Sequence, residues 1–140
     1  MTTETQDKLA ARLNQRWNAA DLRAFADLDH PEPLASLKQA EQWLAQRPMD
    51  SSLLLACARL AMRAELYGKA RRYLESSLAA HPSPEAALLL AHLLEHTDQR
   101  ERAYKVLKNV LTAMAGGEFA LPKIHAPRSE RRKTADRRRR

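Results

Sequence analysis

Proline residues divide most of this 140-residue chain into segments whose lengths suit single helices. They stand at positions 31, 33, 48, 82 and 84, and the segments between them place apolar residues three or four positions apart. That spacing puts apolar side chains on one face of a helix, and no long segment alternates with the period of two that a strand requires. With only three glycines, a β-sandwich or barrel with many tight turns is also disfavoured. We predict seven helices, over about residues 4–16, 20–29, 33–47, 51–64, 67–80, 84–97 and 100–114.

A pattern of large apolar, small and proline residues recurs along these segments at an interval of about 34 residues. Counted from Ser51 as position 1, it comprises Leu54, Cys57, Ala58, Tyr67, Ala70, Leu74, Leu78 and Pro82. Counted from Pro84, it comprises Leu90, Ala91, Leu94, Ala103, Leu107 and Leu111. A third copy, counted back from Pro48, is degenerate and puts Trp17 at position 1, Ala24 at position 8 and Ser36 at position 20.

This pattern resembles the tetratricopeptide repeat, in which two helices form a hairpin and successive hairpins stack. Small residues let the two helices of a hairpin touch, and the proline stops the second helix. The resemblance implies an all-α fold, an α-α superhelix of about three hairpins over about residues 17–48, 51–83 and 84–115. The helix at 4–16, with Leu9 and Leu13 on one face, looks like the second helix of a hairpin whose first helix is missing. We predict a repeat domain over about residues 1–115 with this extra N-terminal helix, and interpret the chain as a fragment or a C-terminal domain.

The sequence also resembles a narrower family. The residues that carry this resemblance are Trp43-Leu44, Arg47-Pro48, Asp50, Leu53 to Leu55, Arg59-Leu60, Leu66 to Arg71, Tyr73 to Ser77, Pro82 and Leu93 to Glu95. Across about residues 17–111 the chain is similar to the C-terminal half of HemY-type proteins, bacterial inner-membrane proteins associated with haem (porphyrin) biosynthesis. The family's two transmembrane helices and its earlier repeats have no counterpart here, and Cys57-Ala58 replaces a Leu-Gly pair.

The resemblance implies a scaffold whose protein partner is a haem-biosynthesis enzyme. It also implies a parent protein at the inner membrane, with this region on the cytoplasmic side. The chain itself is expected to be soluble, because its longest apolar runs fall far short of the roughly 20 residues that span a bilayer. A generic tetratricopeptide adaptor or chaperone for another partner is the first alternative, and a haem- or porphyrin-binding protein is the second.

Motifs for catalysis are missing from the sequence. It has no glycine-rich phosphate loop and no nucleophile elbow. The one cysteine, Cys57, falls at an interior repeat position, where a small core hydrophobe is expected rather than a nucleophile. We therefore expect a noncatalytic protein without a required cofactor.

Tetratricopeptide arrays bind partners in a concave groove lined by the first helices of successive hairpins, chiefly at positions 2, 5, 9, 12 and 13. In the second repeat those positions hold Ser52, Leu55, Arg59, Met62 and Arg63. In the third they hold Glu85, Leu88, His92, Glu95 and His96, and in the first Asn18, Asp21, Phe25, Leu28 and Asp29. This mixture suits an extended peptide or a partner helix. Arg59 and Arg63 either grip a carboxylate of the partner or are ordinary surface arginines.

His92 and His96 are the one pair with the spacing of metal ligands. Residues four apart share a helix face, so both imidazoles project together. Two ligands without a third make a weak site, and a polar face of the last repeat is the simpler interpretation; haem or metal binding remains the alternative. The aromatic residues Trp43, Tyr67, Tyr73 and Tyr104 fall at positions where we expect helix packing.

The net charge of +7 is concentrated at the C-terminal end. Residues 117–140 hold nine basic and three acidic side chains, whereas the rest of the chain holds fifteen and fourteen. We predict a disordered basic tail over 116–140, because clustered like charge with few apolar residues cannot form a core. Its candidate contacts with anionic lipid are Arg131, Arg132, Lys133, Arg137, Arg138, Arg139 and Arg140. Nonspecific nucleic-acid binding and simple solubilisation are the alternatives, and no specific nucleic-acid binding is expected.

Overall fold

The computed structural model describes residues 2–116 and 122–125 of the chain, and this part is all helical apart from its turns and ends. Its seven helices are α1 (Thr2–Gln15), α2 (Ala19–Asp27), α3 (Pro33–Gln46), α4 (Ser51–Arg63), α5 (Tyr67–Ala80), α6 (Pro84–His96) and α7 (Arg100–Met114). All seven expected helices are confirmed, with bounds that agree within two residues. None of the described helices is both long and apolar enough to cross a membrane.

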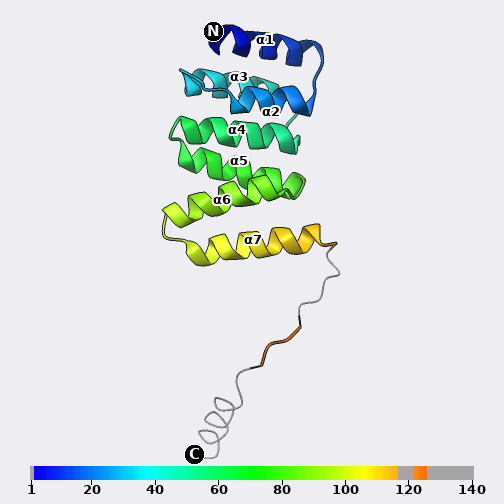
Figure 1. The fold of residues 1–140 in the computed structure, drawn as a ribbon, viewed down its shortest axis with the longest axis vertical. Coiled ribbons are helices and arrows are strands. Elements are labelled where there is room, and N and C mark those ends of the chain that lie inside the picture. The colour runs from blue at the N-terminus through cyan, green and yellow to red at the C-terminus, as the bar shows by residue number, and fades with distance from the viewer. Residues whose placement is uncertain (1, 117–121, 126–140) are drawn as a thin grey trace, which may run out of the picture.

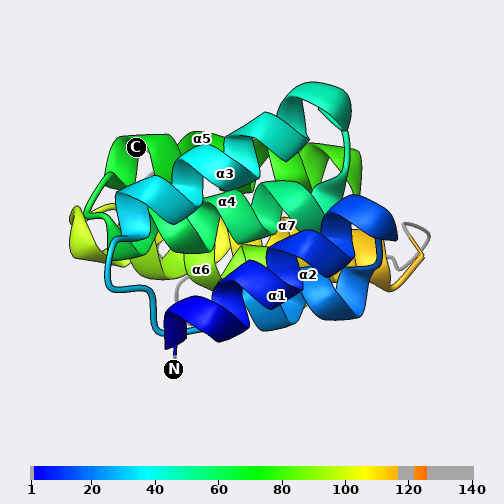
Figure 2. The same ribbon diagram turned by 90° about the horizontal axis from the view of Figure 1, so that it is seen from above.

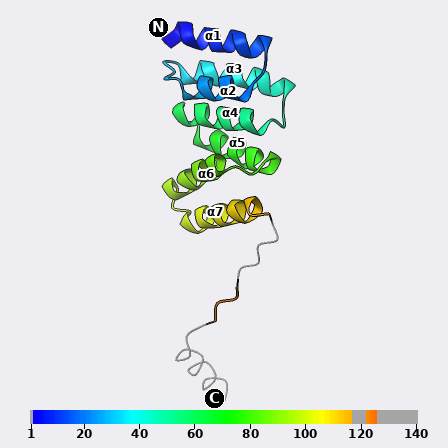
Figure 3. The ribbon, with the colours of Figure 1, turned by 45° about the vertical axis from the view of Figure 1, so that its right-hand side comes forward.

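The helices stack along one axis in an order close to their order in the chain (Figures 1 and 3). Contacts join α1 to α2, both α2 and α3 to α4, α4 to α5, α5 to α6, and α6 to α7. Seen along the stack, α3 and α5 lie towards one side, and α2 and α6 lie towards the other (Figure 2). Most helices therefore bury a face against the next helix along the chain, whereas α2 packs against α1 and α4.

Polar side chains cap the N-termini of the helices α2, α4 and α6 in the same way. Asn18 Oδ1 accepts a hydrogen bond from the backbone N–H of Asp21 at 2.7 Å. Asp50 Oδ1 does the same for Leu53 at 3.1 Å, and Ser83 Oγ for Ala86 at 3.2 Å. Each side chain satisfies an N–H group that has no partner within its helix, which fixes where the helix begins.

The turns from α4 to α5 and from α6 to α7 share one backbone geometry. Glu65 and Asp98 occupy matching places in these turns and have φ angles of 59° and 55°. Positive φ is uncommon for residues other than glycine. In each turn, an N–H bonds back to a carbonyl five residues earlier, as in a Schellman motif; the pairs are Leu66 to Ala61 and Gln99 to Leu94, both at 2.8 Å. The two helical hairpins therefore close alike, although their turn sequences differ.

Small residues fill the seam of these hairpins as predicted, whereas Leu111, which the pattern also placed at a packing position, is 60% exposed. Ala58 and Ala70 are fully buried in the pair α4–α5, and Ala91 and Ala103 are nearly so in the pair α6–α7. At the far end of α7, Gly116 has a φ of 99°, which favours glycine and follows the last helical turn.

The predicted register of α2 is wrong by two residues. Ala24, placed at the small-residue position, is exposed, whereas Leu22, Phe25 and Ala26 are buried. Counting back from Pro48 fails because α2 has 9 residues where α4 has 13, while the connection 28–32 is only two residues longer than the connection 64–66. The start of α2 therefore lies two residues closer to the start of α3 than the repeat length predicts. Leu28, directly after α2, already has an extended backbone, with φ −60° and ψ 150°.

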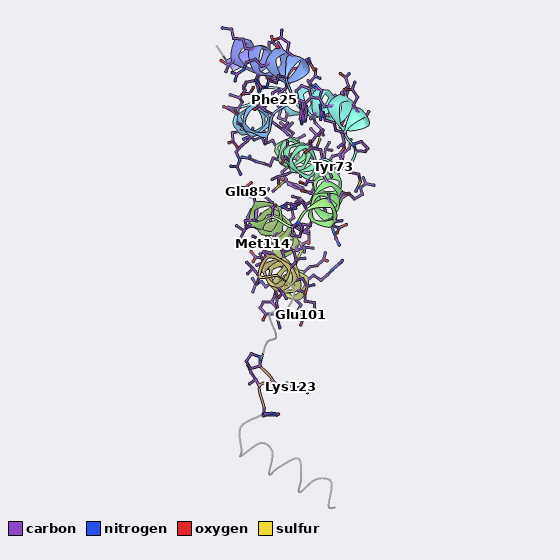
Figure 4. All side chains as sticks on the ribbon, turned by 90° about the vertical axis from the view of Figure 1, so that its right-hand side faces the viewer. Phe25, Tyr73, Glu85, Glu101, Met114 and Lys123 are labelled. Atoms are coloured by element: carbon purple, nitrogen blue, oxygen red, sulfur yellow. The ribbon has the colours of Figure 1, made fainter. Side chains whose placement is uncertain are left out.

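The aromatic predictions are only partly confirmed. Trp43 is buried, with its ring centroid 5.2 Å from Phe25 and 5.7 Å from Trp17. Figure 4 shows Phe25 among the helices at the N-terminal end of the stack. Tyr67 and Tyr104, however, are 52% and 64% exposed, because they lie on outward faces of α5 and α7. The expectation that these two tyrosines pack in the core was therefore wrong.

Candidate binding groove

Helices α2, α4 and α6 line two adjoining open pockets on one side of the stack. The first, of about 430 Å³, is lined by Ala19, Ala20, Leu22, Arg23, Ala26, Ser52, Leu55, Ala56, Arg59 and Glu85. The second, of about 470 Å³, is lined by Arg23, Asp27, Leu55, Arg59, Glu85, Leu88 and Leu89. We call their combined lining the α2–α4–α6 groove. It is apolar at its base and carries charged groups of both signs.

Two ion pairs join the helices that form the groove. Arg23 of α2 pairs with Glu85 of α6, and Arg59 of α4 pairs with Asp27 of α2. All four side chains remain partly or largely open to solvent. Water and salt weaken pairs of this kind, so a partner's charged group could replace one member at little cost. In Figure 4, Glu85 lies on the opposite edge of the stack from Tyr73.

The opposite edge is tied together by Glu41 of α3. The Tyr73 hydroxyl donates a hydrogen bond to Glu41 Oε1, and Lys69 Nζ lies at the same oxygen, both at 2.5 Å. Burial alone would raise the pKa of Glu41, but the contacts with Lys69 and Tyr73 outweigh it and lower that pKa. Burial and the Glu41 contact together raise the pKa of Tyr73. These bonds join α3 to α5 on the edge away from the groove.

Both predicted arginines have partners within the chain. Arg59 pairs with Asp27, and Arg63 donates hydrogen bonds to the backbone carbonyls of Leu28 and Asp27. A guanidinium at the end of α2 also meets the negative end of that helix dipole. Binding of a partner carboxylate by Arg59 would therefore be an exchange for Asp27.

The other predicted groove residues of α4 and α6 divide into three groups. Leu55 lines both pockets, and Leu88 is 61% exposed at the rim of the second. Met62 packs partly buried against the core. The side chains of His92, Glu95 and His96 are exposed on α6 and line neither pocket.

The predicted groove residues of the first repeat were misplaced by the register error. Phe25 is fully buried, and Asn18 caps α2. Asp21 is also buried, where it accepts hydrogen bonds from Arg12 at 2.6 Å and from Asn18 at 2.8 Å. Leu28 is partly buried against the core, and Asp29 is exposed but lines neither pocket.

In their place α2 contributes Ala20, Arg23 and Asp27 to the groove. A signal for this register was present in the sequence. Leu22, Phe25 and Ala26 have the same spacing as Leu54, Cys57 and Ala58 of α4, and that match places Arg23 and Asp27 on the open face.

His92 and His96 lie side by side on the surface of α6. Their ring centroids are 5.2 Å apart and their planes are tilted by 39°. Among the described residues, no group of three or more histidine, cysteine or acidic side chains is placed to hold a metal ion. The third ligand that a stable site would need is thus not supplied by this part of the chain.

Cys57 lies in the core as predicted. Its side chain is fully buried, and this burial raises the pKa of the thiol to about 12. A buried thiol that stays protonated is a poor nucleophile, so its role here is packing.

His30 is a buried polar residue that sequence reasoning missed. Its Nε2 lies 2.7 Å from the backbone carbonyl of Phe25, and its Nδ1 lies 2.7 Å from Ser36 Oγ. Ser36 Oγ in turn accepts a hydrogen bond from Gln6 Nε2 at 2.9 Å. The chain of bonds links α1, α3 and the end of α2. Burial lowers the pKa of His30, although the hydrogen bond to Phe25 opposes that shift.

The candidate lipid contacts of the tail, from Arg131 to Arg140, lie outside the residues that the structure describes.

Comparison of the chain with protein-family models, with curated proteins and with solved structures finds no match.

Proposed function

We propose that the chain is a noncatalytic protein-interaction module, an α-α superhelix of three tetratricopeptide-type hairpins preceded by α1. The observation that carries the proposal is the α2–α4–α6 groove, to which the first helix of each hairpin contributes apolar and charged side chains. An open surface of this composition suits an extended segment or a helix of another protein.

The likeness of the hairpins supports the repeat part of this proposal. Each first helix begins with a polar cap, and the turns at Glu65 and Asp98 share an unusual backbone geometry. These two turns differ in sequence but adopt the same geometry at the same place in the hairpins α4–α5 and α6–α7. Equivalent units that stack on their neighbours are what a repeat array requires.

The resemblance of about residues 17–111 to HemY-type proteins suggests the partner. We propose an enzyme of late haem biosynthesis, held by the parent protein at the cytoplasmic side of a bacterial inner membrane. A generic tetratricopeptide adaptor or chaperone would use the same groove for a different protein, so the identity of the partner separates the two.

Affinity capture from the native host, with variants matched in chemistry, tests the proposal. Leu88→Glu puts a charge at the groove, and Leu34→Glu puts the same charge on an exposed leucine of α3 outside it. Partners that bind in the groove should be captured by the wild type and by Leu34→Glu, and lost from Leu88→Glu. Equal capture by both variants would exclude the groove as the binding site. Mass spectrometry of the captured proteins then decides between a haem-biosynthesis enzyme and another partner.

A further inference from the structure

The last helix of the stack leaves an apolar face open. Tyr104 and Leu111 of α7 are 64% and 60% exposed, and with Lys108 and Ala115 they follow one another along one side of the helix. Together with Thr112, Pro122 and Ile124 they line an open pocket of about 750 Å³. We call this surface the α7 outer face. It lies apart from the α2–α4–α6 groove.

The preceding hairpin shows what covers the equivalent surface there. Leu74 and Leu78 of α5 correspond to Leu107 and Leu111 of α7, as Glu65 corresponds to Asp98 in the turns. Leu74 is fully buried and Leu78 packs against the core, because helix α6 lies against α5. Leu111, in contrast, is exposed, and within the described residues no helix follows α7. Leu111 therefore gives the α7 outer face an apolar site at which a further helix can pack. Tyr104 and Lys108 correspond to Arg71 and Glu75, which α6 leaves partly open to solvent on α5.

The charges around this face decide which helix fits. The exposed charged residues of α7 are basic except for one: Arg100, Arg102, Lys105 and Lys108 against Glu101. A second copy of this chain would bring the same excess of positive charge, and residues 117–140 carry nine basic and three acidic side chains. Like charges across an interface oppose binding, whereas acidic groups favour it.

We infer that the α7 outer face docks an acidic amphipathic helix of a partner protein. The leucine-rich side of that helix would cover Leu107 and Leu111, as α6 covers Leu74 and Leu78 of α5, and would extend onto Tyr104. Its glutamate or aspartate flanks would meet Lys105 and Lys108. This is the helix-in-groove mode of recognition, with aliphatic anchors for affinity and charges for specificity.

The test is a titration of two labelled peptides into the full chain, followed by fluorescence anisotropy. One peptide is an amphipathic helix with leucines at helical spacing and glutamates on its flanks, and its matched control carries lysines in place of the glutamates. The acidic peptide should bind saturably, at least tenfold more tightly than the control, and more weakly as salt is raised. Absence of saturable binding by the acidic peptide would overturn the inference.

Three variants locate the binding. Leu111→Glu should weaken binding of the acidic peptide at least tenfold, while Leu34→Glu and the groove variant Leu88→Glu should leave it unchanged. All three replace exposed leucines, and circular dichroism checks that each remains helical. A loss in Leu88→Glu with none in Leu111→Glu would place the peptide in the groove and contradict the inference. A second result would also contradict the inference: the acidic peptide does not bind, and the chain floats with phosphatidylglycerol vesicles in a way that Leu111→Glu abolishes. The α7 outer face would then be a lipid contact.

Discussion

Replacing Trp43 by alanine should destabilise the chain by about 3–5 kcal/mol, the usual cost of removing a large buried aromatic side chain. The indole is buried, packs edge-on against Phe25 and Trp17, and donates a hydrogen bond from Nε1 to Asn14 Oδ1 at 2.8 Å. An aromatic side chain buries about 150–250 Å², which at about 25 cal/mol per Å² corresponds to about 4–6 kcal/mol. That value is an upper bound, because a real unfolded chain already buries part of this surface.

Urea unfolding followed by circular dichroism at 222 nm measures this cost. The matched control is Tyr104→Ala, since Tyr104 is 64% exposed and should change the free energy of unfolding by no more than about 0.5 kcal/mol. The loss in Trp43→Ala should appear mainly in the helices α1, α2 and α3, because the indole of α3 contacts Asn14 of α1 and Phe25 of α2. A loss below about 1 kcal/mol, or an equal loss in both variants, would refute the packing described for this junction.

Four further outcomes follow from the structure. Burial lowers the pKa of His30 below its unfolded value near 6.5, so the stability that His30 contributes is present above that pH and is lost as the pH falls. Urea unfolding at pH 7.5 and 5.5 should show this loss in the wild type and less of it in His30→Gln. An identical pH dependence of stability in the wild type and His30→Gln would contradict the assignment of this effect to His30. The Cys57 thiol, with its pKa raised to about 12, should react with Ellman's reagent at pH 8 only after unfolding, and rapid reaction of the native chain would place it at the surface. Hemin titration should give the same Soret band for the wild type and for His92→Ala/His96→Ala, since the exposed pair lines neither groove pocket; a Soret shift confined to the wild type would favour haem binding. The full chain should float with anionic vesicles more than residues 1–116 alone, and equal partition would remove the proposed lipid contact of the tail.

The helices could be predicted from sequence because their start and stop signals are local. Asn18, Asp50 and Ser83 cap the helices that follow them, and apolar spacing defines each buried face. Burial of Cys57 and of the paired alanines also followed from spacing, since only small side chains fit where two helices touch. The same argument identified Leu55 and Arg59 as residues on the open side of α4.

The register of α2 could not be obtained by counting from a distant proline. Helix α2 is four residues shorter than α4, which the two extra residues of the connection 28–32 only partly offset, and the resulting shift of two residues places Phe25 in the core and Arg23 at the surface. His30 was missed because a buried histidine has no periodic signature. Its partners, Phe25 and Ser36, lie five and six residues away on either side, and the path of the chain between α2 and α3 brings them to it.

The α2–α4–α6 groove is tested most directly by linking two of its helices. In a Cys57→Ser background, cysteines replacing Arg23 and Glu85 should be joined within one chain by a short bismaleimide, because these residues pair across the groove although they are far apart in sequence. Cysteines replacing Arg23 and Glu101, on α2 and α7, should not be joined by the same reagent. The linked chain should lose the partner that the wild type captures. Failure of the link to form, or a linked chain that captures the partner unchanged, would contradict it.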